Sequence, residues 1–506
     1  MTNTLDTIPP ELLASVFGFL EDQGPYHGRL GAFYTLSLTS RAMRNAATPY
    51  LYKTFQQGLH SRTMGRFVRS LCHNPELAKH VRSIDIHPNQ LKPDSSPTPA
   101  DAQLFTDAAS ALKELSCHDE ICSALQRGCY SALALLLVSL TTKLASLHLG
   151  SLFSEEVIDG LFQQTETGVV VIQDKLCTCC ANISIWYLWI EVIFGTLHLR
   201  NRYQRLTEAH VVGTGILGLG AARALLHLPS LQKMTCENFG TITAPFDWGE
   251  ATADSNLTAL HIEGGYLSVN DVAGMAKSCK GLRELSVEWD AEAVIEDDWV
   301  EAPSIDVSSV LEVIHDYVAT LETLVLVDLA DEGRIFSSRA SNIHDFIALR
   351  TLEVDESVLV GGTTWGLVEL HFPPNLVSLV VHTNGMLEDL AAVSFALYRA
   401  RCEVLDNVRI TFPIEPGKND GWTEFRGVCS VTPEDHIIHR PQTMRWKFGM
   451  DVTYDGESLE VWCHGKSVWV EMGSWGTGLT ERGLGWLFDH TCDSTQMGRC
   501  SYPLMW

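Results

Sequence analysis

Apolar residues recur at helical spacing at the start of the chain. Between residues 8 and 20 they lie mostly three or four positions apart, as on one side of an α-helix, and Thr7 can cap the first turn. A loop with glycine and proline follows, and a second amphipathic stretch ends near residue 52. We therefore predict a helical domain over residues 1–55. The apolar stripe of its first helix comprises Leu12, Leu13, Val16, Phe17 and Leu20.

A different pattern organises residues 104–415, beyond a connecting helix, a short strand and a proline-rich linker predicted over residues 56–103. The repeated unit is L-x-x-L-x-L or a close apolar variant. Its middle positions from residue 231 onward are 29, 25, 39, 28, 27 and 29 residues apart, which makes chance spacing of leucines a poor alternative. Steps of about 20–29 residues are typical of leucine-rich repeats, in which each unit supplies one strand and one returning helix. Copies of the unit begin at Leu144, Leu228, Leu257, Leu282, Leu321, Leu349, Leu376 and Leu405.

Two segments interrupt this repeat. Residues of about 165–210 fit no unit and are interpreted either as an irregular repeat or as non-coding sequence retained in the gene model. The long step of 39 residues contains an acidic loop at residues 290–306. Insertions of this kind emerge on one side of a repeat array, so the loop is either part of a binding surface or a solvated excursion.

The tail, residues 416–506, changes character. Apolar residues alternate with period two around residues 444–448, 459–463 and 468–472, and turn residues separate the first two runs from their successors. Tryptophans are concentrated here, either for core packing or for an aromatic binding surface. The predicted fold class is therefore α/β: an N-terminal helical domain, a leucine-rich-repeat-like solenoid of strand–helix units, and a small antiparallel β cap at the C-terminus.

Composition narrows the functional classes. The 506 residues carry a net charge of −26, and 45% of them are hydrophobic, so the chain can bury a large core. This acidity argues against nucleic acid and membrane surfaces as partners. The charge is uneven, because residues 1–92 contain ten Lys/Arg and six Asp/Glu. No signal peptide or membrane span is expected, and the scattered cysteines predict reduced thiols and a cytoplasmic or nuclear location.

The first 55 residues resemble an F-box. The resemblance runs through Ile8-Pro9, Leu12-Leu13 and Val16-Phe17, then through residues 36–41 and an exit at residues 47–52, although the loop over residues 21–33 is longer than usual. Fungal F-box proteins with degenerate leucine-rich repeats share this layout. The resemblance implies docking on the acidic Skp-type adaptor of a cullin-RING ubiquitin ligase, which suits a basic head; the alternative is a plain helical start of the core. The implied adaptor contacts are Ile8, Pro9, Leu12, Leu13, Val16, Phe17, Leu36, Leu38, Ser40 and Arg41.

One motif points to an enzyme instead. Gly213, Gly215 and Gly218 form G-x-G-x-x-G, and Glu237 follows at the distance expected of a dinucleotide-binding fingerprint. The preceding strand is short, however, and no strand–helix–strand series is evident around it, so a turn before a repeat helix is the favoured interpretation. Cys177, Cys179 and Cys180 lack a second ligand pair at zinc spacing.

The sequence thus predicts a non-catalytic protein without cofactor or metal. The F-box resemblance implies the substrate-receptor subunit of a Skp–cullin–F-box ubiquitin ligase, which would bind the adaptor through the N-terminal helices and an unknown target protein through the repeats. Two alternatives remain: an interaction scaffold outside any ligase, and a dinucleotide-binding enzyme that uses the 213–218 loop.

Overall fold

The chain forms two compact units, residues 1–282 and 283–506, in a computed structural model. The residues that it describes are 8–22, 26–56, 62–86, 97–150, 162–165, 168–171, 190–196, 200–213, 216–240, 246–248, 255–290, 304–328, 336–360, 371–382, 407–414, 425–433, 446–454 and 457–463.

The first unit begins with helices and continues with alternating strands and helices. Its described elements, in chain order, are α1 (Pro10–Asp22), α2 (Tyr26–Ser37), α3 (Arg41–Leu51), β1 (Thr54–Gln56), α4 (Arg62–His73), η2 (Pro75–His80), β2 (Ser83–Ile86), α5 (Pro99–Ala108), η3 (Ala109–Leu112), α6 (His118–Gln126), α7 (Tyr130–Leu140), β3 (Ser146–Leu149), β4 (Phe162–Thr165), β5 (Gly168–Val171), β6 (Glu208–Val212), α11 (Ile216–Leu226), β7 (Lys233–Gly240), β8 (Ala259–Tyr266) and α12 (Val269–Lys277).

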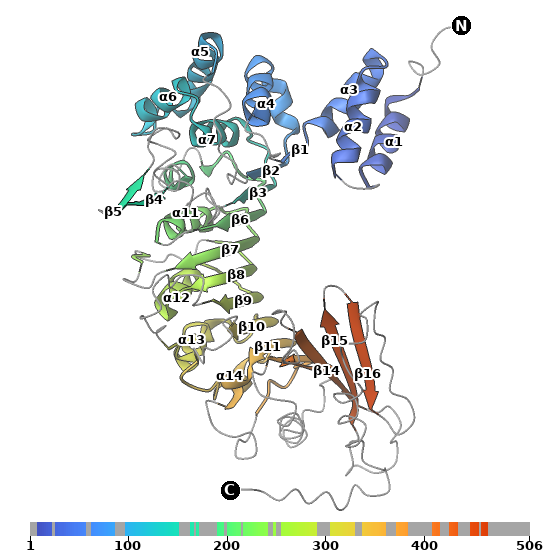
Figure 1. Cartoon of the computed structure of the whole chain (residues 1–506), viewed down its shortest axis with the longest axis vertical. Helices are drawn as coiled ribbons and strands as arrows, with labels where there is room; N and C mark the ends of the chain where they lie inside the picture. Colours follow the sequence, from blue (N-terminus) through green and yellow to red (C-terminus); the bar gives the residue numbers. More distant parts are fainter. Residues whose placement is uncertain are drawn as a thin grey trace, which may run out of the picture. The chain divides into compact units, whose positions relative to one another are not determined.

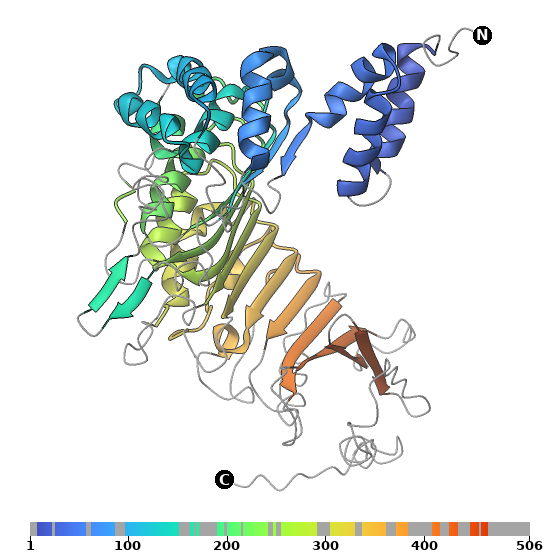
Figure 2. The same cartoon turned by 45° about the horizontal axis from the view of Figure 1, so that its top comes forward.

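A parallel sheet organises this unit. Its strands follow the order β1, β2, β3, β6, β7 and β8, and every neighbouring pair is parallel. Alternate residues along the strands are buried, so that Ile84 stacks on Leu147 of the next strand. Figures 1 and 2 show α11 and α12 on one side of β6, β7 and β8. The buried residues face these helices, and the intervening residues face the opposite side.

Local sequence explains several helix starts. Ser268 and Asp271 form a reciprocal capping box at the start of α12, and the Thr98 hydroxyl accepts a hydrogen bond from the Asp101 backbone at the start of α5. The helix α7 is almost wholly buried, which fits its uninterrupted apolar sequence. Within the described ranges, no single helix is long and apolar enough to cross a membrane, and the only helix pair that passes by length and composition is bent by 118° between α6 and α7.

The second unit continues the strand pattern. Its described elements are β9 (Glu284–Trp289), α13 (Val307–Val313), η5 (His315–Tyr317), β10 (Thr323–Asp328), η6 (Ile343–Asp345), β11 (Thr351–Asp355), α14 (Glu356–Val360), β12 (Ser378–His382), β13 (Asn407–Ile414), β14 (Phe425–Pro433), β15 (Trp446–Tyr454) and β16 (Glu457–Cys463). The strands β9 to β13 pair in parallel, each with the next. Leu285, Leu324, Leu352 and Leu379 share one register position and are fully buried.

The predicted fold class, a leucine-rich-repeat-like solenoid closed by a small antiparallel β cap, is wrong. The fold is α/β on a parallel sheet, and its last described strands do not form a separate cap. The strand β14 pairs antiparallel with β13 itself, and β15 and β16 follow in turn, so these strands continue the sheet. Alternation of apolar and polar residues determines which side of a sheet a residue takes, but not which edge its strand joins.

Several predictions fall on residues outside the described ranges. They include the cysteine cluster at residues 177–180, most of the acidic loop at residues 290–306 and the last alternating run at residues 468–472. The predicted domain boundaries stay predictions.

Candidate functional site

The three helices α1, α2 and α3, here called the N-terminal module, have their own core. Ser40 begins α3, because its hydroxyl accepts a hydrogen bond from the backbone N–H of Met43 at 3.2 Å. Proline at the first position of α1 also suits a helix start, since its missing N–H has no partner within the helix. The buried core consists of Leu13, Phe17, Phe33, Met43 and Ala47.

Three aromatic rings hold the module together. The Phe17 ring lies with its centroid 5.6 Å from that of Phe33 and 5.6 Å from that of Tyr50, and the Phe33 and Tyr50 centroids are 5.4 Å apart. The Tyr50 hydroxyl also donates a hydrogen bond to the Ala14 carbonyl at 3.0 Å, which ties α3 to α1. Each helix therefore contributes one ring to the same cluster, and aromatic pairs at these separations add to the stabilisation from buried area.

The helix α1 carries a second apolar stripe that faces solvent. Leu12, Val16 and Phe19, here called the outer stripe, are 58%, 53% and 65% exposed. Their spacing of four and three residues places them along one side of the helix, about 100° around the axis from the buried stripe, because each residue turns an α-helix by about 100°. The outer stripe therefore takes no part in the module core.

Two more exposed apolar side chains are Tyr34 on α2, at 60%, and Leu38 in the turn between α2 and α3, at 61%. Of the six large hydrophobic side chains that are exposed in the described part of the chain, five lie on this module, and the sixth is Ile347 in the second unit. Single exposed apolar residues are common, but a concentration on one small element marks an interaction site. The N-terminal module is therefore the candidate functional site.

The structure separates the ten residues that the F-box resemblance implies as adaptor contacts. Half of them are exposed: Pro9, Leu12, Val16, Leu38 and Arg41.

The remaining five serve the module itself, in its core, against its core or as the cap of α3: Ile8, Leu13, Phe17, Leu36 and Ser40. Sequence reasoning missed Phe19 and Tyr34. Helical spacing could have identified Phe19, since it falls on the same side of α1 as Leu12 and Val16.

Positive charge flanks this apolar surface. Arg41 and Arg44 are exposed on α3, and neither end turn of α3 contains an acidic residue. The ammonium of Lys53 lies 2.5 Å from a Glu21 carboxylate oxygen, which joins the end of α1 to the turn after α3. The module therefore combines apolar side chains with cationic ones, a combination that suits an acidic partner with an apolar patch.

The glycine loop was the main alternative site. Contrary to the sequence analysis, a strand–helix–strand unit does surround it, because β6, α11 and β7 follow one another and β6 pairs in parallel with β7. The space that a side chain at Gly213 would need is filled by the fully buried Phe239 ring, whose nearest atom would be 1.7 Å from an added Cβ. An added Cβ at Gly218 would be 2.6 Å from the same ring. Packing against Phe239 thus accounts for these two glycines, and Gly215 lies outside the described residues.

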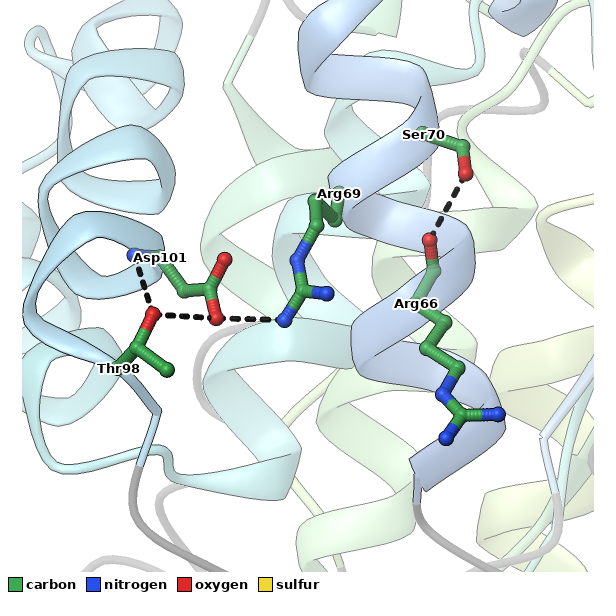
Figure 3. Close-up of polar contacts among 5 residues, drawn as sticks. All are labelled: Arg66, Arg69, Ser70, Thr98 and Asp101. Carbon is green, nitrogen blue, oxygen red and sulfur yellow. Dashed lines mark hydrogen bonds and ion pairs between the residues drawn. The ribbon is translucent and has the colours of Figure 1, made fainter.

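A buried carboxylate joins α4 to α5 (Figure 3). Arg69 donates a hydrogen bond to Asp101 at 2.5 Å, the Thr98 hydroxyl donates to the same oxygen at 2.7 Å, and Arg66 points away from them. Burial raises the pKa of Asp101, but the hydrogen bonds from Thr98 and Arg69, with the Arg69 charge, lower it overall below its ordinary value. The Asp101 carboxylate is paired with Arg69 of α4 and with Thr98 at the start of α5, so we assign the cluster to helix packing.

We expect Asp101→Asn to reduce the free energy of unfolding by about 1–3 kcal/mol at neutral pH. Because folding lowers the pKa of this carboxyl, its contribution is present above the unfolded value of about 3.9 and is lost as pH falls through the folded value. Urea denaturation at pH 7 and at pH 3 measures the difference, which should shrink at the lower pH. The exposed Asp107 on the same helix provides the control Asp107→Asn, and equal effects of the two changes would contradict the assignment.

Three of the described thiols are poor nucleophiles. Burial raises the pKa of Cys72 to about 11 and that of Cys279 to about 12, so both stay protonated at neutral pH. The Cys122 sulfur lies 3.4 Å from Nε2 of His118, one helical turn away on α6. Burial, and then the Asp119 charge, raise the pKa of Cys122 as well. That direction opposes formation of the thiolate that cysteine catalysis needs.

Metal ligands and relatives add no further site. In the described ranges, no group of three or more His, Cys, Asp or Glu residues could hold a metal ion. No protein-family model matches the chain, and no curated protein matches it.

Proposed function

We propose that the chain is the substrate-receptor subunit of a Skp–cullin–F-box ubiquitin ligase. The N-terminal module binds the Skp-type adaptor, and the parallel sheet carries a target protein. The chain itself contributes no catalytic group in this proposal. It raises the effective concentration of target lysines near the ubiquitin-conjugating enzyme, which other subunits recruit.

One observation carries this proposal: the outer stripe on α1 is exposed although the module core is complete without it. Small helical modules commonly use such a stripe to bind a partner's apolar groove. The exposed Leu38 and Arg41 extend the surface toward the junction of α2 and α3. Apolar anchors with charges at their rim are the usual anatomy of a protein interface.

The test is co-purification of the intact chain with recombinant Skp-type adaptor, compared with the double variant Leu12→Asp plus Val16→Asp. Burying each apolar side chain contributes about 1.5–3 kcal/mol, so their joint loss should weaken binding by about 100-fold or more. Both side chains are more than half exposed, and the variant should therefore fold as the parent does.

Two controls accompany this test. Ile347→Asp places the same change at a site that is 53% exposed, as Val16 is, but lies in the second unit. Ala14→Asp places it on α1 itself, on the side opposite the outer stripe. Both controls should bind the adaptor like the parent chain. If the folded parent binds no adaptor, the ligase proposal is wrong; if it binds adaptor but the complex never recruits a cullin, the chain is an interaction scaffold.

A further inference from the structure

The side of the first unit's sheet opposite α11 and α12 is polar and acidic. Its middle row runs across five strands in register, from β2 to β8. We call this row the histidine row: Asp85, His148, His210, Thr235 and His261. The residues between these positions along the strands are buried, so the row lies on the face that the helices leave open.

The histidine row is a connected set of contacts. Nδ1 of His148 lies 3.0 Å from an Asp85 carboxylate oxygen, and the His148 and His210 rings stack with centroids 4.1 Å apart and planes 5° from parallel. Nε2 of His210 lies 3.0 Å from a carboxylate oxygen of Glu237. The side chains of Asp85, His148, His210 and Glu237 are 19%, 25%, 30% and 38% exposed. One oxygen of Asp85 and Nε2 of His148 are buried, so a partner reaches His210 and Glu237 most directly.

Carboxylates dominate the rows beside it. Glu237 on β7 and Glu263 on β8 are register partners, and Glu208 precedes His210 by two residues on β6. With Asp85, the described strand positions on this face carry four carboxylates and one ammonium, that of Lys233. Like charges side by side on neighbouring strands cost folding free energy, which a cationic side chain placed between them would recover.

We infer that this open face binds a lysine- or arginine-rich segment of a protein partner, and that protonation of His210 releases it. The inference rests on the proposed function, since it assigns the target-binding surface of the proposed receptor. Charge complementarity selects the occupant, because a basic segment meets the carboxylates of Asp85, Glu237 and Glu263. The surface would not attract an acidic or phosphorylated segment.

Release follows from competition for the carboxylates. Burial, and then the neighbouring His148, lower the pKa of His210 and so favour its neutral ring, which leaves the negative charge of Glu237 available to attract a cation. Below that pKa, His210 becomes the cation that pairs with Glu237. The other charged groups facing His210 are Glu208 on its own strand, Asp85 beyond His148, and Lys233 and Glu263 on the following strands. The net effect of acidification is a less negative face.

The probe is a fluorescein-labelled peptide of about ten residues with alternating lysine and serine, which presents every lysine on one side when extended. Anisotropy titration of the full chain measures its affinity. We expect Glu237→Gln plus Glu263→Gln to weaken binding by about tenfold at about pH 7.5. The matched control is Glu312→Gln plus Asp316→Asn, which removes the same charge from exposed positions of the second unit and should change affinity by less than about twofold.

The pH dependence of peptide binding tests the release of the basic segment. Parent affinity should fall by about fivefold or more between about pH 7.5 and pH 5.5, where the carboxylates remain ionised, and His148→Gln plus His210→Gln should abolish this dependence. Equal weakening by both charge variants, or an unchanged affinity in the Glu237/Glu263 variant, overturns the inference. A parent affinity that does not change with pH overturns the release step. Adaptor binding by the same preparations is measured separately, so failure here with intact adaptor binding leaves the proposed function standing.

Discussion

Phe17→Ala is expected to unfold the N-terminal module within the full chain. The Phe17 ring is 1% exposed and lies between the rings of Phe33 and Tyr50, so its removal leaves a cavity at the point where all three helices meet. Such a truncation costs about 3–5 kcal/mol. A module of three short helices has little stability in excess of this value. Hydrogen–deuterium exchange should show loss of protection across α1, α2 and α3, and adaptor binding should be lost with it.

Phe19→Ala provides the matched control, two residues along the same helix. This side chain is 65% exposed, so its truncation should change the stability of the module by less than about 0.5 kcal/mol. Adaptor binding should nevertheless weaken, because Phe19 belongs to the outer stripe. Equal loss of exchange protection in the two variants would show that the assignment of α1 to a buried and an exposed side is wrong.

This pair also shows how far the sequence could predict the site. The spacing of Leu12, Leu13, Val16 and Phe17 indicates a helix with a wide apolar arc, and the structure has one there. Apolar residues over such a wide arc can face both the module core and a partner protein. Residue type alone does not show which residues face the core and which face the partner. Leu13 and Phe17 were therefore expected among the adaptor contacts although they lie inside the module.

The strands likewise include some that the sequence predicted and some that it did not. The leucine units predicted strands where β8 to β12 lie, because two apolar residues separated by one position face the same side of a strand and must be buried together. The strand β6 was predicted too short, since Glu208 and His210 on its open face interrupt the apolar run. The tail was predicted to be antiparallel, but the pairing of β14 with β13 was missed, because pairing depends on the connections between strands rather than on their alternation.

The sequence did not reveal the strand–helix–strand unit that surrounds the glycine fingerprint. The residue that explains Gly213 and Gly218, Phe239, lies on the next strand and has no fixed spacing to them in any motif. Long-range packing of this kind leaves no local signal. Measuring how substitutions of Gly213 and Phe239 change stability therefore distinguishes a structural loop from a cofactor-binding loop.

Gly213→Ala is expected to destabilise the first unit by more than about 2 kcal/mol, because the added Cβ would lie 1.7 Å and 1.9 Å from two atoms of the buried Phe239 ring. The control Gly65→Ala, in α4, adds the same methyl group where no atom lies within 4 Å, and should stabilise its helix by about 0.5–1 kcal/mol. Urea denaturation measures both effects on stability. Hydrogen–deuterium exchange of peptides from β6 and β7 then locates the effect of Gly213→Ala.

A double-mutant cycle identifies the cause. Phe239→Ala alone leaves a cavity and costs about 3–5 kcal/mol, but in its presence the methyl group at residue 213 gains space. The double variant should therefore be more stable than the sum of the single changes predicts, by about 1–3 kcal/mol. Additive effects would mean that Phe239 is not the obstacle.

A rise in the melting temperature of the parent chain on adding NAD⁺, abolished by Gly213→Ala, would instead establish the loop as a dinucleotide site, since a ligand that binds only the folded state stabilises it.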